Sequence, residues 1–148
     1  MTIALASDHA GFNLKKFLVR KLRDEGYEVL DLGPHQDKSV DYPEYAKMVA
    51  EQVGSGRVEK GVLVCGSGVG MSIAANKFSG VRCALVHDTY YAKLSRLHND
   101  ANIIALGGRV IAEEFAWEIV TVFLETPFSG GRHSGRIKKI REFEDEKG

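Results

Sequence analysis

The segment from residue 62 to residue 77 combines a cysteine with closely spaced glycines. Cys65 ends an apolar run that is typical of a buried parallel strand, and Gly66–Gly70 then leads into a helix start. Ligands of open α/β sheets bind at the carboxyl ends of the strands. Glycines let the backbone come close to a small anion, and the unpaired N–H groups of a helix start suit a phosphate or a developing oxyanion. A thiol in that field should ionise more readily than a free one, so the segment predicts a thiolate beside an oxyanion cradle.

Three well-known anion loops do not fit this segment. A nucleotide-binding P-loop requires Lys followed by Ser or Thr after the glycines, and no such pair follows the glycines of this segment. The dinucleotide fingerprint requires a third glycine where Met71 stands, although Asp88 lies about 20 residues further on, as such folds prefer. A cysteine phosphatase would have arginine at the position of Met71. We therefore expect the thiol to move a proton rather than attack phosphorus.

Composition excludes several classes of function. The 148 residues fit one domain, residues 1–148, and the 20 basic and 20 acidic side chains cancel. No overall field attracts nucleic acid or an anionic membrane surface, and neither a leader nor a membrane-spanning run is recognised. We expect a cytoplasmic protein. Cys65 and Cys83 lack metal-ligand spacing, so we expect neither a disulfide framework nor a metal site.

Strand and helix patterns alternate along the chain. Strands are expected at 2–7, 27–32, 62–65, 82–86 and 103–106, with helices at about 14–22, 43–53, after 70, 89–97 and about 115–126. This alternation predicts an α/β fold, a three-layer α/β/α Rossmann-like sandwich with a five-stranded parallel sheet. A charged C-terminal helix over 132–146 has too few apolar positions to be stable alone. The tail, about 127–148, should therefore pack on the domain or on a partner subunit.

Polar residues lie next to several of the predicted strands. Because the carboxyl ends of parallel strands share one edge, we expect these groups to meet there, with the imidazole of His98 sharing a cavity with the thiol of Cys65. The groups are Ser7-Asp8-His9 after the first strand, Cys65-Gly66-Ser67 after the third, His87-Asp88 after the fourth, His98-Asn99-Asp100 before the fifth and Arg109 after it.

These residues also have purely structural interpretations. Asp8 could cap the first helix, and His98 with Asn99 could close a helix and form a turn. Arg132 and Arg136 lie four residues apart on one helix face, which is often a solvated surface. For three further residues the structural interpretation is preferred: Cys83 as a strand residue, and His87 and Asp88 as loop and cap residues.

Several blocks of sequence, in one order, carry a family resemblance. They are Ala6–Phe12, Val40–Pro43, Cys65–Gly70, Ser95–Asn102, Gly107–Arg109 and Arg132–Arg136. Together they resemble ribose-5-phosphate isomerase B, of the family that also contains galactose-6-phosphate isomerase subunits, over essentially the whole chain. The resemblance implies interconversion of ribose 5-phosphate and ribulose 5-phosphate in the pentose phosphate pathway, without metal or cofactor. It also implies a homodimer or dimer of dimers with sites at the subunit interface.

The resemblance further implies roles for individual residues. Cys65 would be the base that moves a proton between two carbons, and His98 would open the sugar ring with help from Asp8. Ser67 stands where the family often has threonine and keeps the hydroxyl group. The remaining substrate contacts fall on Gly66, Ser67, Gly68, Val69, Gly70 and Asn99 for the enediolate, on His9, Arg109, Arg132 and Arg136 for the phosphate, and on Tyr42.

General chemistry agrees with an isomerase, because the reaction needs a base at an α-carbon, donors for the enediolate and a clamp on the remote phosphate. Two alternatives stay open. An aldose phosphate of six carbons, such as allose 6-phosphate or galactose 6-phosphate, would need only a deeper pocket. A sugar-phosphate or nucleotide binding module without chemistry would explain the glycines and arginines, but it would leave Cys65 and His98 without a role.

Overall fold

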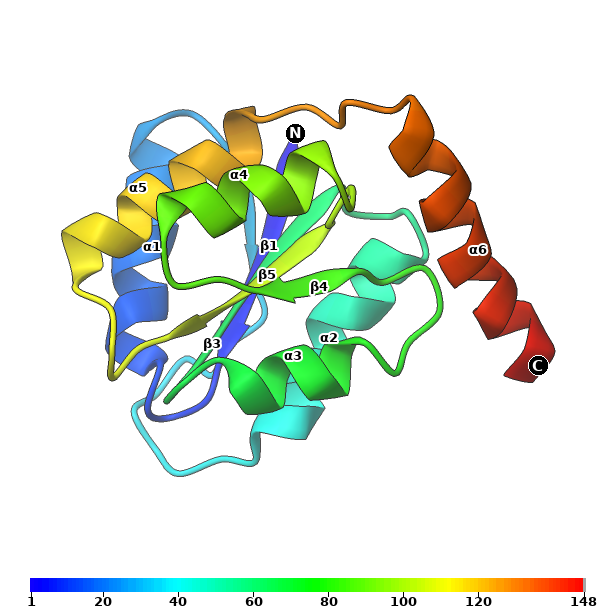
Figure 1. Cartoon of the computed structure of the whole chain (residues 1–148). Helices are drawn as coiled ribbons and strands as arrows, with labels where there is room; N and C mark the ends of the chain where they lie inside the picture. The colour runs from blue at the N-terminus through cyan, green and yellow to red at the C-terminus, as the bar shows by residue number, and fades with distance from the viewer. Residues whose placement is uncertain (148) are drawn as a thin grey trace.

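The computed structural model describes residues 1–147 and contains one sheet with helices on both faces (Figure 1). The strands are β1 (Thr2–Ser7), β2 (Glu28–Asp31), β3 (Lys60–Cys65), β4 (Cys83–Leu85) and β5 (Ile103–Gly107). Their order is β2-β1-β3-β5-β4, and every neighbouring pair is parallel. The predicted five-stranded parallel sheet is confirmed.

The helices form the two outer layers. They are α1 (Phe12–Asp24), α2 (Tyr42–Gly54), α3 (Val69–Ala75), α4 (Thr89–Leu97), α5 (Glu113–Glu125) and α6 (Arg132–Lys147). Figure 1 shows α1, α4 and α5 over one face of the sheet and α2 and α3 over the other. Alternate residues of β1 enter the two resulting cores, Ile3 and Leu5 on one side and Ala4 and Ala6 on the other. Because both faces are covered, the strands are apolar almost throughout.

Predicted and observed element ends differ by a few residues. Helix α1 ends at Asp24, and Gly26 adopts a left-handed φ of +90° in the turn that follows. Helix α2 begins at Tyr42, with Pro43 in its first turn, where the missing N–H of proline costs nothing. Strand β4 is shorter than predicted, because the N–H of Arg82 donates to the side chain of Asn102 at 2.8 Å instead of to a strand.

Neighbouring strands β1 and β3 send their following helices to opposite faces of the sheet. Open α/β sheets bind ligands at such a point, outside the carboxyl ends of the two strands. The loops at these strand ends are tightly packed. A Cβ atom on Gly11 would lie 2.5 Å from the carbonyl oxygen of Val64, and one on Gly108 would lie 2.9 Å from that of Ala10. Only glycine allows this approach.

Helix α6 projects from the body of the domain (Figure 1). Its connection is held to α4, because the guanidinium of Arg96 donates to the carbonyl oxygen of Thr126 at 3.0 Å. Farther along, the carboxylate of Glu144 accepts from the N–H of Gly80 at 3.0 Å. Ile140 and Phe143 are 43% and 58% exposed. Within residues 1–147, no helix is long and apolar enough to cross a membrane.

Candidate active site

The glycine loop after β3 folds over the thiol of Cys65. The side chain is 5% exposed, and its Sγ accepts a hydrogen bond from the N–H of Gly68 at 3.2 Å. Gly68 has a φ of +84°, and a Cβ atom there would lie 2.7 Å from a methyl group of Leu85. The hydroxyl of Ser67 accepts from the N–H of Val69, also at 3.2 Å. The thiol thus sits below a main-chain donor at the start of α3.

Arg109 brings a positive charge to the same loop. The N–H of Gly108 donates to the carbonyl oxygen of Cys65 at 2.7 Å, and that of Arg109 donates to the carbonyl oxygen of Gly66 at 3.1 Å. The Arg109 guanidinium lies against Gly66, where an added Cβ atom would be 3.2 Å from Nη1. Because Arg109 is exposed, its charge is available to a ligand at the strand ends.

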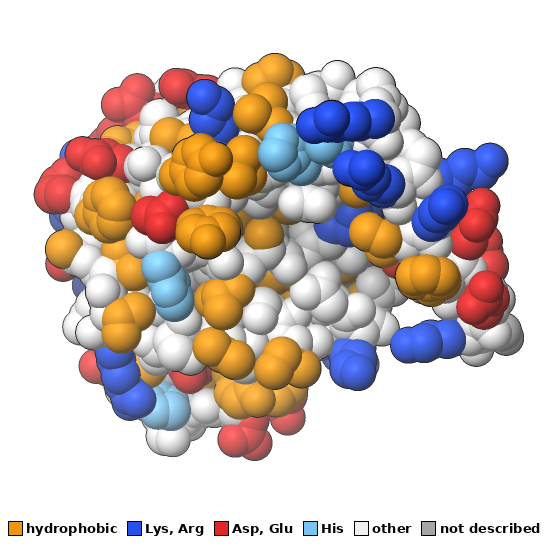
Figure 2. All heavy atoms as spheres, viewed as in Figure 1, with side chains coloured by type: hydrophobic (Ala, Val, Ile, Leu, Met, Phe, Trp, Pro, Cys, Tyr) orange, Lys and Arg blue, Asp and Glu red, His pale blue; other side chains and the backbone are white. Residues whose placement is uncertain are grey.

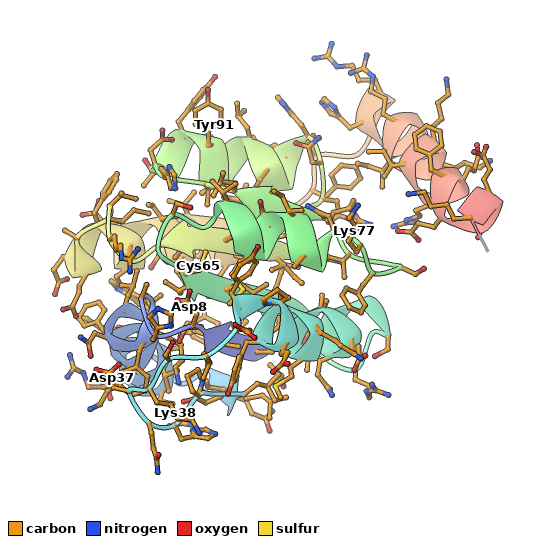
Figure 3. All side chains as sticks on the ribbon, turned by 90° about the horizontal axis from the view of Figure 1, so that it is seen from below. Asp8, Asp37, Lys38, Cys65, Lys77 and Tyr91 are labelled. Atoms are coloured by element: carbon orange, nitrogen blue, oxygen red, sulfur yellow. The ribbon has the colours of Figure 1, made fainter. Side chains whose placement is uncertain are left out.

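The loop after β1 adds Asp8 and His9. The N–H of Asp8 donates to the carbonyl oxygen of Val64 at 3.1 Å, which places Asp8 beside Cys65, as Figure 3 also shows. One carboxylate oxygen of Asp8 accepts from the N–H of Gly11 at 3.0 Å, so Asp8 does stabilise the turn before α1. His9 is exposed, and its Nδ1 accepts from the N–H of Val40 at 3.4 Å. A neutral His9 therefore carries its proton on Nε2, where it can donate to an anion.

Tyr42, the first residue of α2, borders the glycine loop on its other side. Its ring packs on Gly70, where a Cβ atom would lie 2.6 Å from two ring carbons. The side chain is 38% exposed. We call the residues gathered around Cys65 the strand-end cluster: Asp8, His9, Tyr42, Cys65–Gly70 and Arg109.

A second group of predicted residues gathers where α4 meets α6. The rings of His98 and His133 stack, with centroids 4.4 Å apart and planes 16° apart. Arg132 and Arg136 are exposed on the first turns of α6. Figure 2 shows histidine and basic side chains gathered on the surface on the side from which α6 projects. We call this group the tail cluster: His98, Asn99, Arg132, His133 and Arg136.

The expectation that His98 and Asn99 meet Cys65 at one edge of the sheet is wrong within a single chain. Helix α4 runs back antiparallel to the strands, so its C-terminal end precedes the amino end of β5. Register pairs Ile103 with Gly61 and Gly107 with Cys65, at opposite ends of the two strands. At about 3.3 Å per residue, roughly 13 Å of strand separates the two levels. Arg132 and Arg136, which flank His133 on α6, lie near His98 and away from Cys65.

A groove of about 780 Å³ lies between α6 and the edge of the sheet. Its walls include Ile73 of α3, Cys83 of β4, Asn99, and Ile140 and Phe143 of α6. Burial raises the pKa of the Cys83 thiol to about 12, which agrees with a structural role. Within residues 1–147, no group of three or more His, Cys, Asp or Glu side chains could hold a metal ion.

A family model described as Ribose/Galactose Isomerase matches residues 3–140. The chain belongs to the ribose/galactose isomerase family. It is 46% identical to Escherichia coli ribose-5-phosphate isomerase B over 142 residues, 96% of this chain and 95% of that protein. The structure of Clostridium thermocellum ribose-5-phosphate isomerase B superposes with a TM-score of 0.98 and 48% identity, covering 100% of both chains. That of the Mycoplasma genitalium enzyme with bound ribulose-5-phosphate has a TM-score of 0.95 and 41% identity, covering 98% of this chain and 97% of the other.

The match to the ribose/galactose isomerase family spans both clusters, since residues 3–140 include Asp8 and Arg136. Two residues of this family member make contacts that the sequence did not predict. His133 stacks on His98, and its position between Arg132 and Arg136 in a matching block was the available signal. His87, interpreted as a loop residue, donates to the carbonyl oxygen of Ser67 at 2.9 Å in the strand-end cluster. The position of His87 after the fourth strand predicted that it lies at this edge of the sheet, but no pattern in the sequence indicated the hydrogen bond to Ser67.

Proposed function

We propose that this chain is a ribose-5-phosphate isomerase, which interconverts D-ribose 5-phosphate and D-ribulose 5-phosphate in the pentose phosphate pathway of the cytoplasm. The observation that carries the proposal is the Cys65 thiol, held below the N–H of Gly68 at a strand end in a chain of the ribose/galactose isomerase family. The names of the similar E. coli and C. thermocellum enzymes supply the substrate class.

Cys65 serves as the base of the isomerisation. In the aldose-to-ketose direction, the thiolate takes the proton from C2 and returns it to C1, while O1 gains the proton that O2 loses. Negative charge develops on the enediolate oxygens between these steps. The main-chain N–H groups of Gly66–Gly70 and the hydroxyl of Ser67 donate to these oxygens, and such donors typically accelerate a reaction by about 100-fold to 1,000-fold each.

The ring-opening group and part of the phosphate clamp come from a second copy of the chain in a homodimer. His98, assisted by Asp8, protonates and deprotonates the ring oxygen and the anomeric hydroxyl, and a histidine suits that task near neutral pH. Because His98 lies at the opposite end of the sheet from its own Cys65, the tail cluster of one subunit completes the strand-end cluster of the other. The exposed apolar side chains of Ile73, Ile140 and Phe143 beside the groove support burial against a partner.

The phosphate is held far from the reacting carbons. Arg132 and Arg136 of the tail cluster act together with His9 and Arg109 of the strand-end cluster, while Asn99 of the tail cluster serves the enediolate. Arg132 and Arg136 of one subunit and Arg109 of the other bring positive charge to the same site. The phosphate of the substrate neutralises this charge. Binding energy obtained at the phosphate can hold C1 and C2 in position over the thiol.

The experiment is an isomerase assay in which NMR monitors the conversion of the sugar phosphate. Wild-type protein should equilibrate ribose 5-phosphate with ribulose 5-phosphate. Cys65→Ala should lose a factor of about 100 to 10,000 in turnover, the usual contribution of a general base, while it still binds ribose 5-phosphate in calorimetry. Cys83→Ala, the matched change of the other cysteine, should keep its activity.

Binding without conversion by the wild type would contradict an enzyme and favour a binding module. Allose 6-phosphate and galactose 6-phosphate are tested in the same assay. Faster turnover of either one than of ribose 5-phosphate would overturn the five-carbon assignment and leave the isomerase class intact.

A further inference from the structure

The peptide unit between Ser67 and Gly68 is hydrogen-bonded at both ends. Its N–H, on Gly68, donates to the Sγ of Cys65 at 3.2 Å. Its carbonyl oxygen, on Ser67, accepts from Nε2 of His87 at 2.9 Å. The C=O and N–H of a trans peptide point in opposite directions in one plane. The contacts therefore form a continuous chain from the imidazole through the peptide to the thiol.

The two acceptors, the carbonyl oxygen of Ser67 and the sulfur of Cys65, fix the direction of donation along these hydrogen bonds. A carbonyl oxygen has no proton to give, so Nε2 of His87 must carry the proton. A hydrogen bond received by the carbonyl oxygen polarises the peptide and strengthens donation by its N–H. The donor that faces Cys65 is thus oriented and strengthened by a side chain from the segment between β4 and α4.

The glycine loop needs an external support of this kind. Rotation of the Ser67–Gly68 peptide changes the ψ of Ser67 and the φ of Gly68, and Gly68, at a φ of +84°, has no Cβ atom to restrict that φ. A side chain cannot stiffen Gly68, because a Cβ atom would lie 2.7 Å from Leu85 and 3.0 Å from the main chain of Leu106. Rotation of the peptide would replace the N–H beside the thiol by a carbonyl oxygen, which repels a thiolate.

His87 is itself held in place by fixed neighbours. The N–H of Val86 donates to the carbonyl oxygen of Ala105 at 3.2 Å, which continues the contact between β4 and β5. On the other side, the carboxylate of Asp88 accepts from the N–H of Tyr91 at 2.8 Å and caps α4. His87 therefore reaches the glycine loop from a short, well-anchored segment.

We propose that His87 is a positioning residue for Cys65, which locks the Ser67–Gly68 peptide so that its N–H faces the sulfur and stabilises the thiolate. The proposal rests on the proposed function only in taking Cys65 as the base. His87 touches neither substrate nor reacting atoms in this role, and its effect passes through the peptide.

Two variants separate the hydrogen bond from the shape of the side chain. His87→Phe keeps a ring of similar size without a donor, and His87→Gln keeps an N–H at a similar reach. We expect His87→Phe to lower kcat about threefold to tenfold, which corresponds to the net value of one hydrogen bond. KM should stay nearly constant, because the phosphate contacts are untouched. His87→Gln should recover most of the lost kcat.

A second readout follows the thiol directly and needs no substrate. The rate of iodoacetamide modification of Cys65, located by mass spectrometry, is measured across a pH series. Cys83 should stay unmodified at neutral pH, because burial raises its pKa to about 12. Asp8 and Arg109, the charged groups beside Cys65, are the same in all variants. In His87→Phe the midpoint of the Cys65 curve should move to higher pH, and in His87→Gln it should return toward the wild-type value.

The control is His35→Phe, the same substitution at an exposed histidine outside both clusters, which should change neither readout. A wild-type kcat together with a wild-type modification curve in His87→Phe would overturn the proposal. Equal losses in the Phe and Gln variants would also overturn it, because shape alone would then matter. Should His87→Phe fold poorly, His87→Ala gives the same two readouts. If the wild type proves inactive on sugar phosphates, the proposed function fails, while the modification curve still tests His87.

Discussion

The imidazole of His133 stacks on that of His98, with 4.4 Å between ring centroids. The contact joins the first turn of α6 to the end of α4 and creates a site with several positive groups. Partial burial lowers the pKa of His133 below its ordinary value of 6.5, and the positive charges of His98, Arg132 and Arg136 lower it further. An anion among these groups would reverse that effect.

We therefore predict an NMR titration of His133 with a midpoint below 6.5 in the free protein. Addition of inorganic phosphate should raise the midpoint, and so should His98→Gln, which removes a positive neighbour. The pKa of His133 is lower when α6 is docked on α4 than it would be with α6 detached. Protonation of His133 therefore favours detachment of α6. Docking of α6 should thus weaken as the pH falls below 6.5. A midpoint at or above that value would show that the cluster does not disfavour the charged ring.

Mixed dimers provide a test of the shared site. Cys65→Ala and His98→Gln should each be nearly inactive as pure proteins. After the two are unfolded and refolded together, random pairing makes half of the dimers mixed, and each mixed dimer has one undamaged site. The mixture should therefore recover about a quarter of the wild-type activity.

A mixture that stays as inactive as its parents would place Cys65 and His98 of one site on the same chain. Wild-type protein that is unfolded and refolded in the same way shows how much activity the procedure itself preserves. A mixture of Cys65→Ala with Cys65→Ser is the matched negative control, since it damages the same half of every site.

The contact between Gly70 and Tyr42 predicts a specific effect of one methyl group. In Gly70→Ala the new Cβ atom would lie 2.6 Å from the Tyr42 ring, so the ring must move away from the start of α3. Alanine suits a helix better than glycine by about 1 kcal/mol, so overall stability should change little. KM for ribose 5-phosphate should rise, because Tyr42 no longer borders the substrate position.

The double-mutant cycle with Tyr42→Ala checks the cause. Gly70→Ala should have almost no further effect on KM in the Tyr42→Ala background, since the clash is gone. Equal effects of Gly70→Ala in both backgrounds would mean that the methyl group acts on the loop itself and not through the tyrosine.

The sequence predicted the position of the Cys65–Gly70 part of the strand-end cluster because its signals are local. An apolar run that ends in Cys65 and continues into glycines specifies a strand, a turn and a helix start, and these positions follow from neighbouring residues. The location of His98 was predicted wrongly because the order of elements along the chain does not state their direction. His98 precedes β5 in the sequence and thus lies at the amino end of that strand, away from Cys65.

Long-range polar contacts were beyond sequence reasoning for a different reason. The contact of His87 with Ser67 spans 20 residues, and that of Lys15 with Asp31 spans 16. Helical periodicity places Lys15 among apolar neighbours of α1, but the periodicity contains no information about a distant carboxylate. Such pairs become visible only when the sheet order brings their elements together.

The ammonium group of Lys15, a side chain only 2% exposed, donates to a carboxylate oxygen of Asp31 at 2.9 Å and to the carbonyl oxygen of Pro34 at 2.8 Å. The same oxygen of Asp31 accepts from the N–H of Gly33 at 3.0 Å. Lys15 thus ties α1 to the beginning of the 33–41 segment, whose Val40 contacts His9.

Lys15→Met keeps the length of the side chain but leaves Asp31 without its cation. Removing one partner of a buried pair costs about 3–5 kcal/mol, and we expect about 3 because Asp31 is 19% exposed. Urea unfolding should show a lower midpoint at an unchanged slope. Lys16→Met, the same change at the exposed neighbouring residue, should stay within about 0.5 kcal/mol of wild type. In Lys15→Met with Asp31→Asn, part of the loss should return, because the unpaired charge is gone. Equal stability of the Lys15→Met and Lys16→Met variants would show that the ion pair does not hold α1 to this segment.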